Sequence, residues 1–534
     1  MLFNSAIFLG GFLPFVFAGY LLLARYGTRT FTMVWLTLAS LVFYGWSNPA
    51  YVPLLVGSAV FNFTVGRALV ANPRRVVLWL GIAANVGLLG YFKYTGFAVD
   101  AFNHMFGTHS IVPQIALPLA ISFFTFQQIA YLIDSHDGAV VSNNLLEYSL
   151  FITFFPSLIA GPITRNREIV KQIKDPDRLK PRWDNTAVGA TLFCAGLFKK
   201  VIVADRFAEW ANPVFGEAAE GAPVHFIHAW GAALSYSMQL YFDFSGYSDM
   251  AIGLGLLFGI ALPINFNSPY KARDIIDFWG RWHITLTRFL TAYIYNPLGV
   301  SIGRLRARRG FPLPKRGRMS AGAFAALIVV PSLFTMFISG LWHGAGWQFI
   351  VFGLLHGFYL VVSHAWRQWR AYRRLPPQSE SLPGIAASVL LTFLCVLVAA
   401  VFFRASDVPA ALNILSGMAG LNGVTIPPSL QGTLGFGSMF GWRFENLPHS
   451  DAAQAIWIVG ALAAVWSLPN ALEWLSRYHT AVNFAPPQNW LQERVPALVW
   501  RPTASAGVVL GVVFCFAVLV TLSAAPAQFI YFQF

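Results

Sequence analysis

Charged residues are scarce in this sequence. Of its 534 residues, only 11% are Asp, Glu, Lys or Arg, whereas about 25% is usual for a soluble domain. Hydrophobic residues make up 56% of the chain and aromatic residues 16%. The shortage of charge excludes an ordinary soluble domain and predicts a protein that crosses the membrane many times.

Cysteine and acidic residues are also few. Cys194, Cys395 and Cys515 each lie in an apolar run with no partner at metal-ligand spacing, so neither a disulfide framework nor a metal site is indicated. The 22 acidic residues are outnumbered by 36 Lys and Arg residues, which gives a net charge of +14. Because the basic residues cluster between apolar runs, we interpret the excess as a topology signal and expect no nucleic-acid partner.

Long uncharged runs make up much of the chain. Runs such as 384–403 and 503–523 have the length of a spanning helix and lack the alternation of a barrel strand. The predicted fold class is therefore an all-α polytopic membrane protein with 11 or 12 transmembrane helices, plus re-entrant and interfacial helices. The expected spans lie at about residues 1–24, 33–47, 53–70, 76–92, 115–133, 185–204, 231–260, 321–341, 346–365, 384–403, 455–472 and 505–524.

The distribution of Lys and Arg predicts the orientation. With the N-terminus outside, the six connecting segments that face the cytoplasm carry 30 of the 36 Lys and Arg residues. Both termini are then outside. The first basic residue, Arg25, follows the whole first apolar run, so we expect a retained first helix and no cleaved signal peptide. The run 150–162 is short and broken by prolines, and we expect it to be re-entrant or buried.

Two histidines lie inside apolar sequence near the middle of the chain. His343 stands between Trp342 and a glycine, and His356 follows in the next apolar run. An ionisable side chain at membrane depth is costly, so it usually faces an interior or cavity where it is used. His343 is the first functional candidate. The alternative is a hydrogen-bonded core histidine or a member of an interfacial aromatic belt.

Other polar residues also fall inside apolar runs. Asp243 lies near the middle of its expected span, where a carboxylate needs a partner or must be protonated. Gln127 and Gln128 are adjacent amides in another span. For all three, a structural role in holding helices together is favoured over direct catalysis.

The segment 265–283 carries too many charges to span the membrane and too many aromatic residues for a free loop. We expect an amphipathic or partly buried cytoplasmic helix over 271–288. Asp277 and Arg281 are four residues apart and are expected to pair. His283, with Arg281 or Arg288, is the candidate entrance for an anionic donor, and the ion pair alone is the structural alternative. The basic stretch 304–318 is interpreted mainly as a topology signal, and the alternative is contact with the phosphates of a nucleotide-bearing donor or with anionic lipid.

These segments resemble the membrane-bound O-acyltransferases, and within that family the bacterial alginate O-acetyltransferase branch. The similarity covers essentially the whole chain as one membrane domain, with N-terminal helices at 1–133, a catalytic core at about 149–403 and C-terminal helices at 404–534. The motifs that carry it are Gly90–Tyr94, Leu117–Gln127, Tyr241–Asp249, the stretch from Asp277 to Gly299, Gly340–Gly344, Phe402–Ala405 and the ending Phe529–Phe534.

The resemblance implies helices around a central channel in the bacterial inner membrane, and transfer of an acetyl group across that membrane. The acceptor would be a hydroxyl of an exported polysaccharide or of a periplasmic acceptor protein. The implied donor is acetyl-CoA, with no bound cofactor. Membrane lipids are the expected surroundings. His343 matches the catalytic histidine, while the expected substrate-binding residues are His283, Asp243, Trp342, His356 and Gln127.

The residues themselves support direct transfer. A neutral imidazole can accept a hydroxyl proton as the acceptor attacks a thioester, and no activated Ser or Cys nucleophile is evident. The competing hypothesis is a polysaccharide or lipid-precursor transporter, in which Asp243, His343 and Gln127 line a path without bond chemistry.

Overall fold

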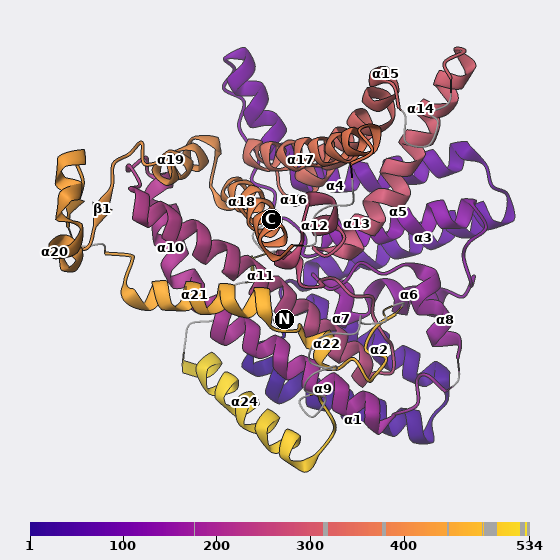
Figure 1. The fold of residues 1–534 in the computed structure, drawn as a ribbon. Coiled ribbons are helices and arrows are strands. Elements are labelled where there is room, and N and C mark those ends of the chain that lie inside the picture. Colours follow the sequence, from indigo (N-terminus) through magenta and orange to yellow (C-terminus); the bar gives the residue numbers. More distant parts are fainter. Residues whose placement is uncertain are drawn as a thin grey trace. The chain divides into compact units, whose positions relative to one another are not determined.

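The computed structural model describes residues 1–175, 177–312, 319–375, 381–445, 448–482, 484, 499–523 and 529–530. Helices dominate these residues (Figure 1). Eight helical stretches among them are long and apolar enough to cross a membrane, which confirms the predicted all-α polytopic class. They are Phe8–Tyr26, Pro49–Ala71, Arg75–Phe106, Trp183–Ala219, Ala321–His343, Trp347–Tyr372, Leu382–Arg404 and Ala504–Ser523.

The other four expected spans also coincide with helices, but these fall outside that group of eight. Helices α2 (Arg29–Gly45), α5 (Ile121–His136) and α21 (Ala452–Ser467) have 17, 16 and 16 residues, whereas a simple crossing needs about 20. Helix α11 (Phe226–Leu257) has 32 residues and contains Asp243. Hydropathy therefore located these helices without showing which of them span.

The chain divides into two compact units that are interleaved in sequence. Unit 1 contains Met1–Ile202, Asp243–Asn265 and Pro469–Gln533, and unit 2 contains Val203–Phe242, Phe266–Leu468 and Phe534. Helix α11 therefore contributes its first half to unit 2 and its second half to unit 1.

Unit 1 is built mainly from the N-terminal helices. Besides α2 and α5, its helices are α1 (Leu13–Tyr26), α3 (Val52–Ala71), α4 (Arg75–Phe106), α6 (Leu145–Thr153), α7 (Phe155–Leu158), α8 (Asn166–Lys174), α9 (Trp183–Phe198), α22 (Ala471–Trp474) and α24 (Ala504–Ser523). Every residue from 151 to 164 is buried, as expected for a broken run enclosed by protein.

Glycines bring α9 and the second half of α11 into backbone contact. A Cβ on Gly196 would lie 2.4 Å from the carbonyl oxygen of Gly246, and one on Gly189 would lie 2.7 Å from that of Gly253. Each helix places its two glycines seven residues apart, which is about two turns. Because the two spacings are equal, the antiparallel helices stay close over that length. The contacts also fix how the residues that follow Gly196 align with α11.

Unit 2 contains the remaining helices and two short strands. The helices are α10 (Asp205–Ala219), α12 (Ile275–Trp279), α13 (Ile284–Leu290), α14 (Asn296–Arg308), α15 (Ala321–Phe324), α16 (Val330–His343), α17 (Trp347–Tyr372), α18 (Leu382–Arg404), α19 (Val408–Met418), α20 (Gln431–Leu434) and α21. Strands β1 (Thr425–Ile426) and β2 (Arg443–Phe444) pair in parallel. The segment 405–445 is therefore folded, because it contains α19, β1 and β2.

The segment 271–288 is not the single helix that its composition predicts. It forms α12 and α13, separated by residues 280–283. The side chain of Asp274 caps α12, and His283 takes a left-handed conformation with φ of 42° immediately before α13. The prediction of one helix is wrong because the left-handed conformation of His283 interrupts the helix. A left-handed conformation at a residue other than glycine is uncommon, so the sequence pattern does not indicate it.

Helices α16 and α17 form a tight hairpin. A Cβ on Gly340 would lie 2.3 Å from the carbonyl oxygen of Phe349, and one on Gly353 would lie 2.3 Å from that of Met336. Both obstructing atoms belong to the backbone, so a side chain cannot be accommodated by a rotamer change. The hairpin fixes the position of His343, the last residue of α16.

We expect Gly340→Ala to separate this hairpin and to destabilise the protein by about 1–3 kcal/mol, as overpacking usually does. The measurement is the apparent thermal midpoint of the protein purified in detergent. Gly87→Ala is the matched control, because a Cβ at Gly87 of α4 meets nothing within 4 Å and alanine favours a helix over glycine. Equal midpoints for the two variants would show that the hairpin is not held by this close approach.

Candidate functional site

His343 lies in a buried cluster of rings in unit 2. Its side chain is only 4% exposed. Its ring centroid is 4.9 Å from that of Trp342, 5.7 Å from that of Phe352 on α17 and 5.0 Å from that of Phe403 on α18. The aromatic walls limit how the imidazole can turn, so a group that reaches it meets a fixed side chain.

His283 and His356 join the same cluster from other elements. The His283 ring is 5.9 Å from Trp342, and the His356 ring is 4.8 Å from Phe352. Both histidines are buried, with exposures of 0% and 1%. The structure therefore brings the three predicted site histidines and Trp342 together, linked through shared aromatic neighbours.

His283 is held in an unfavourable backbone conformation. Its φ of 42° is one of four positive values at non-glycine residues in the described chain, and such strain costs about 1–3 kcal/mol and concentrates at functional sites. Burial lowers the pKa of His283 to about 3. The ring is therefore neutral near pH 7 and is a weak base, so it suits hydrogen bonding better than proton abstraction.

His356 sits in a box of aromatic rings. Phe278 lies parallel to it at 6.1 Å, while Trp279 and Tyr359 present their edges or faces at 5.1 and 5.9 Å. Its Nδ1 atom is buried and accepts or donates no hydrogen bond within the described residues. A buried imidazole in this state can hydrogen-bond a ligand that enters the box.

Two buried hydroxyls share the face of α16 that carries His343, and the sequence interpretation missed them. Thr335, Ser339 and His343 are spaced by four residues, which aligns them on one helix face. Neither hydroxyl has a hydrogen-bond partner among the described residues. By contrast, Ser40 on α2 bonds the carbonyl four residues back. The four-residue spacing in an otherwise apolar run was the available signal.

Asp243 has the partner that its depth requires. In unit 1, its Oδ1 lies 2.7 Å from the ammonium of Lys200, and its Oδ2 accepts a hydrogen bond of 3.1 Å from the backbone N–H of Ile530. Asp243 is 0% exposed and Lys200 4%. The neighbouring Phe529 stacks on Tyr247 at 4.5 Å. Asp243 therefore links the segments that contain Lys200 and Ile530. Residues 531–534, the end of the C-terminal motif, lie outside the described residues.

Gln127 and Gln128 also connect elements of unit 1. The amide of Gln127 donates to Thr164 at 2.9 Å. The carbonyl of Gln128 accepts from Ser58 at 2.8 Å and from Asn62 at 2.9 Å. These contacts hold helices and loops of unit 1 together.

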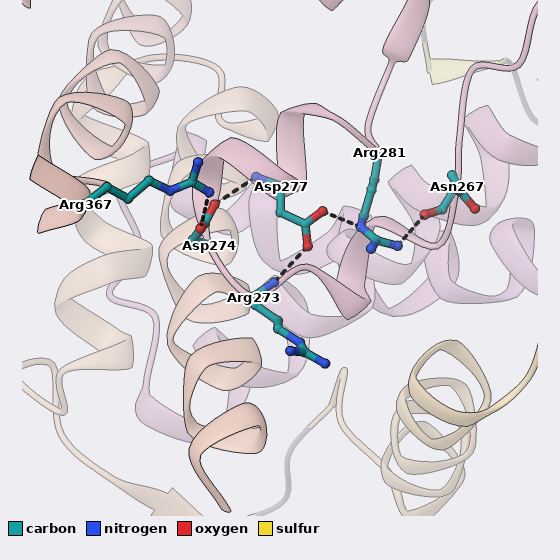
Figure 2. Close-up of polar contacts among 6 residues, drawn as sticks. All are labelled: Asn267, Arg273, Asp274, Asp277, Arg281 and Arg367. Carbon is teal, nitrogen blue, oxygen red and sulfur yellow. Dashed lines mark hydrogen bonds and ion pairs between the residues drawn. The ribbon is translucent and has the colours of Figure 1, made fainter. Parts of the chain in front are cut away.

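The charged residues around α12 form one hydrogen-bonded network in unit 2 (Figure 2). Arg281 donates to Asp277 at 2.7 Å, which confirms the predicted pair, and also to the carbonyl of Asn267 at 3.3 Å. Asp274 accepts from the N–H of Asp277 at 2.8 Å and pairs with Arg367 of α17 at 2.6 Å. The network therefore joins α12 to the C-terminal half of α17.

Known proteins are similar to this chain over most of its length. A model of the membrane-bound O-acyltransferase family matches residues 139–309, which include Asp243 and His283. A peptidoglycan O-acetyltransferase of Helicobacter pylori is 44% identical over 80% of this chain and 81% of the relative. A probable alginate O-acetylase of Pseudomonas aeruginosa is 36% identical over 78% and 75% of the two chains. A teichoic acid D-alanyltransferase of Streptococcus thermophilus is 28% identical over 53% and 68%.

Proposed function

The chain belongs to the membrane-bound O-acyltransferase family, and we propose that it transfers an acetyl group from a thioester to a hydroxyl of a cell-surface polysaccharide. It is a multi-pass membrane enzyme and an O-acyltransferase. The relatives named for peptidoglycan and for alginate support an acetyl group and a glycan acceptor. Both relatives are similar over three quarters or more of this chain. Peptidoglycan and alginate-like polysaccharides are therefore both proposed as acceptor classes.

The observation that carries the proposal is the buried ring cluster around His343. The imidazole takes the proton of the acceptor hydroxyl while the hydroxyl oxygen attacks the thioester carbonyl. The new C–O bond forms, the C–S bond breaks, and the proton passes to the departing thiolate. A preoriented base in a site shielded from water suits this step.

The residues around His343 have separate roles in this mechanism. Ser339 and Thr335 lie on the same helix face and supply hydroxyl donors to the oxygen that gains charge in the tetrahedral intermediate. His283, neutral because of its burial, orients a substrate group by hydrogen bonding. Trp342 contacts both histidine rings, at centroid distances of 5.9 Å from His283 and 4.9 Å from His343.

We further propose acetyl-CoA as the donor, entering from the cytoplasm, and a bacterial inner-membrane location with both termini in the periplasm. The asymmetric distribution of Lys and Arg supports this orientation. A periplasmic acceptor protein or the growing polysaccharide receives the acetyl group. Co-purification with periplasmic proteins tests the first of these partners, whereas efficient glycan acetylation by this protein alone would exclude a need for it.

The proposal predicts coupled release of thiol and formation of an ester. Membranes that contain the protein are given acetyl-labelled CoA with either peptidoglycan strands or alginate. We expect label in one glycan, removable by mild base, in equal amount to the CoA released beyond a no-acceptor control. A transporter would move glycan and release no CoA, and that result with both acceptors would refute acetyl transfer.

A further inference from the structure

Helix α24 is loosely packed against the rest of unit 1. It lies beside α9 (Figure 1), the helix that paired glycines hold against α11. Of the 20 residues of α24, only Ala517 is buried. Lipid tails are as apolar as the side chains of this helix, so most of its surface is available to lipid.

An apolar groove lies between α24, α9 and α1, and it encloses about 680 Å³. Its lining includes Leu13 of α1, Ala187 and Cys194 of α9, and Gly507, Leu510 and Phe514 of α24. Two hydroxyls also line the groove, and both are already bonded. Thr191 donates to the carbonyl of Ala187 at 2.8 Å, and Thr503 accepts from the N–H of Ala506 at 3.2 Å. Because apolar cavities stay free of water, the groove suits an apolar occupant.

The length of the groove matches one leaflet of a bilayer. Its lining on α24 begins at Ala504 and ends at Phe514, ten residues later, which corresponds to about 15 Å along a helix. The hydrocarbon core of a bilayer is about 30 Å thick. The groove therefore covers about half of that thickness, the depth reached by the acyl chain of one phospholipid.

Basic and aromatic residues stand where α24 and α9 begin. Arg501 lies between the lining residues Trp500 and Pro502, and its side chain is exposed. Arg182 immediately precedes α9 and is also exposed, as is Trp183, with an accessible fraction of 82%. Neither arginine forms an ion pair with a described residue. Trp and Arg at the end of a spanning helix are typical of the headgroup region, and exposed arginines there attract anionic lipid.

The indole of Trp500 lacks a hydrogen-bond acceptor at this end of the groove. The side chain is 4% exposed and packs against Tyr478 with the ring centroids 5.3 Å apart. Its Nε1 atom has no partner among the described residues. Buried donors are nearly always paired, so an acceptor from outside the chain would complete this site.

We propose that the groove binds one phospholipid with a net negative headgroup. Its acyl chain lies between α24 and α9, its phosphate lies at Arg501, and a headgroup oxygen accepts from Trp500. The lipid fills the space that the protein leaves between these helices, and it thereby fastens α24 to unit 1. In the orientation proposed above, this is a lipid of the cytoplasmic leaflet. The site does not depend on the acyl-transfer function.

Filling the groove tests the acyl-chain part of the proposal. Native mass spectrometry of the full-length protein in detergent, mixed with phosphatidylglycerol, measures the lipid retained by each chain. We expect wild type to retain one molecule and Gly511→Leu to bind it at least tenfold more weakly, because the leucine occupies the groove. A Cβ at Gly511 meets nothing within 4 Å, so the helix itself accommodates the change.

Gly87→Leu on α4 is the matched control, because Gly87 is equally unobstructed and does not line the groove. Equal retention of phosphatidylglycerol by the two variants would overturn the proposal. A second copy of the chain in the groove predicts a different result: wild type would be a dimer that Gly511→Leu converts to a monomer. That outcome would also overturn lipid binding.

Arg501→Gln tests the headgroup at an exposed position that packing does not depend on. We expect it to weaken phosphatidylglycerol binding about fivefold, the usual contribution of one basic residue at a membrane surface, and to leave phosphatidylcholine binding unchanged. Arg67→Gln, at an exposed basic residue of α3 outside the groove, is the control and should change neither. Trp500→Phe keeps a ring but removes the donor, so it should weaken both lipids.

The headgroup assignment fails if wild type binds the two lipids equally or if Arg501→Gln weakens both to the same extent. Inorganic phosphate should not compete with phosphatidylglycerol, because it has no acyl chain to fill the groove. Competition by phosphate alone would show that an anion site, and not a lipid site, lies at Arg501.

Discussion

Replacing His343 with alanine is expected to reduce acetyl transfer by about 10²- to 10⁴-fold, the usual contribution of a general base. The loss should appear in kcat, because a general base acts in the chemical step. The measurement is label transferred from acetyl-CoA to glycan at saturating donor, normalised to the amount of protein in the membrane. The side chain is at the end of α16, so its removal leaves the hairpin backbone in place.

Variants of different chemistry separate a proton-accepting role from a packing role. His343→Gln fills similar space but is not a base at neutral pH, so it should be as inactive as His343→Ala. Ser339→Ala should lose less, because Thr335 remains on the same face. His104→Ala, at a side chain 83% exposed on α4, should have full activity. Normal transfer by His343→Gln would remove His343 from the chemistry.

The sequence was informative where a residue contradicted its surroundings. His343 and His356 were recognisable because imidazoles are rare in apolar runs, and Asp243 for the same reason. The grouping of the histidines around shared aromatic rings was not predictable. His283 reaches Trp342 only because α12 and α13 are separated by a strained residue, and no periodic pattern encodes that break. Thr335 and Ser339 were missed because hydroxyls in spanning helices usually bond their own backbone, so their composition alone is unremarkable.

The fold shows the same division between local and long-range information. Hydropathy located the helices, because the length and apolar character of a run are properties of that segment alone. It did not reveal that α11 is shared between two compact units, since that division depends on contacts between distant segments. The seven-residue spacing of glycines on α9 and α11 was visible in the sequence, but only the pairing of the two helices shows that the spacings match.

Asp243→Ala is expected to destabilise the protein by about 3–5 kcal/mol, because it leaves the ammonium of Lys200 buried without its counter-ion. The two side chains are 1% and 5% exposed, so water does not replace the lost partner. The expected results are a clear fall in the apparent thermal midpoint in detergent and less protein in the membrane. Asp249→Ala is the comparison, since its partner Lys199 is 18% exposed and can be partly hydrated.

Removing both charges should recover most of this loss. The double variant Lys200→Met with Asp243→Leu removes both charges of this pair, and such replacements are often neutral or stabilising. Recovery should be incomplete by about 1 kcal/mol, because the N–H of Ile530 loses its acceptor. Measuring acetyl transfer by the recovered protein then shows whether Asp243 acts in the reaction or only in packing. Activity near wild type means that the carboxylate acts only through packing of the chain, whereas a stable but inactive double variant would show that Asp243 has a direct part in the reaction.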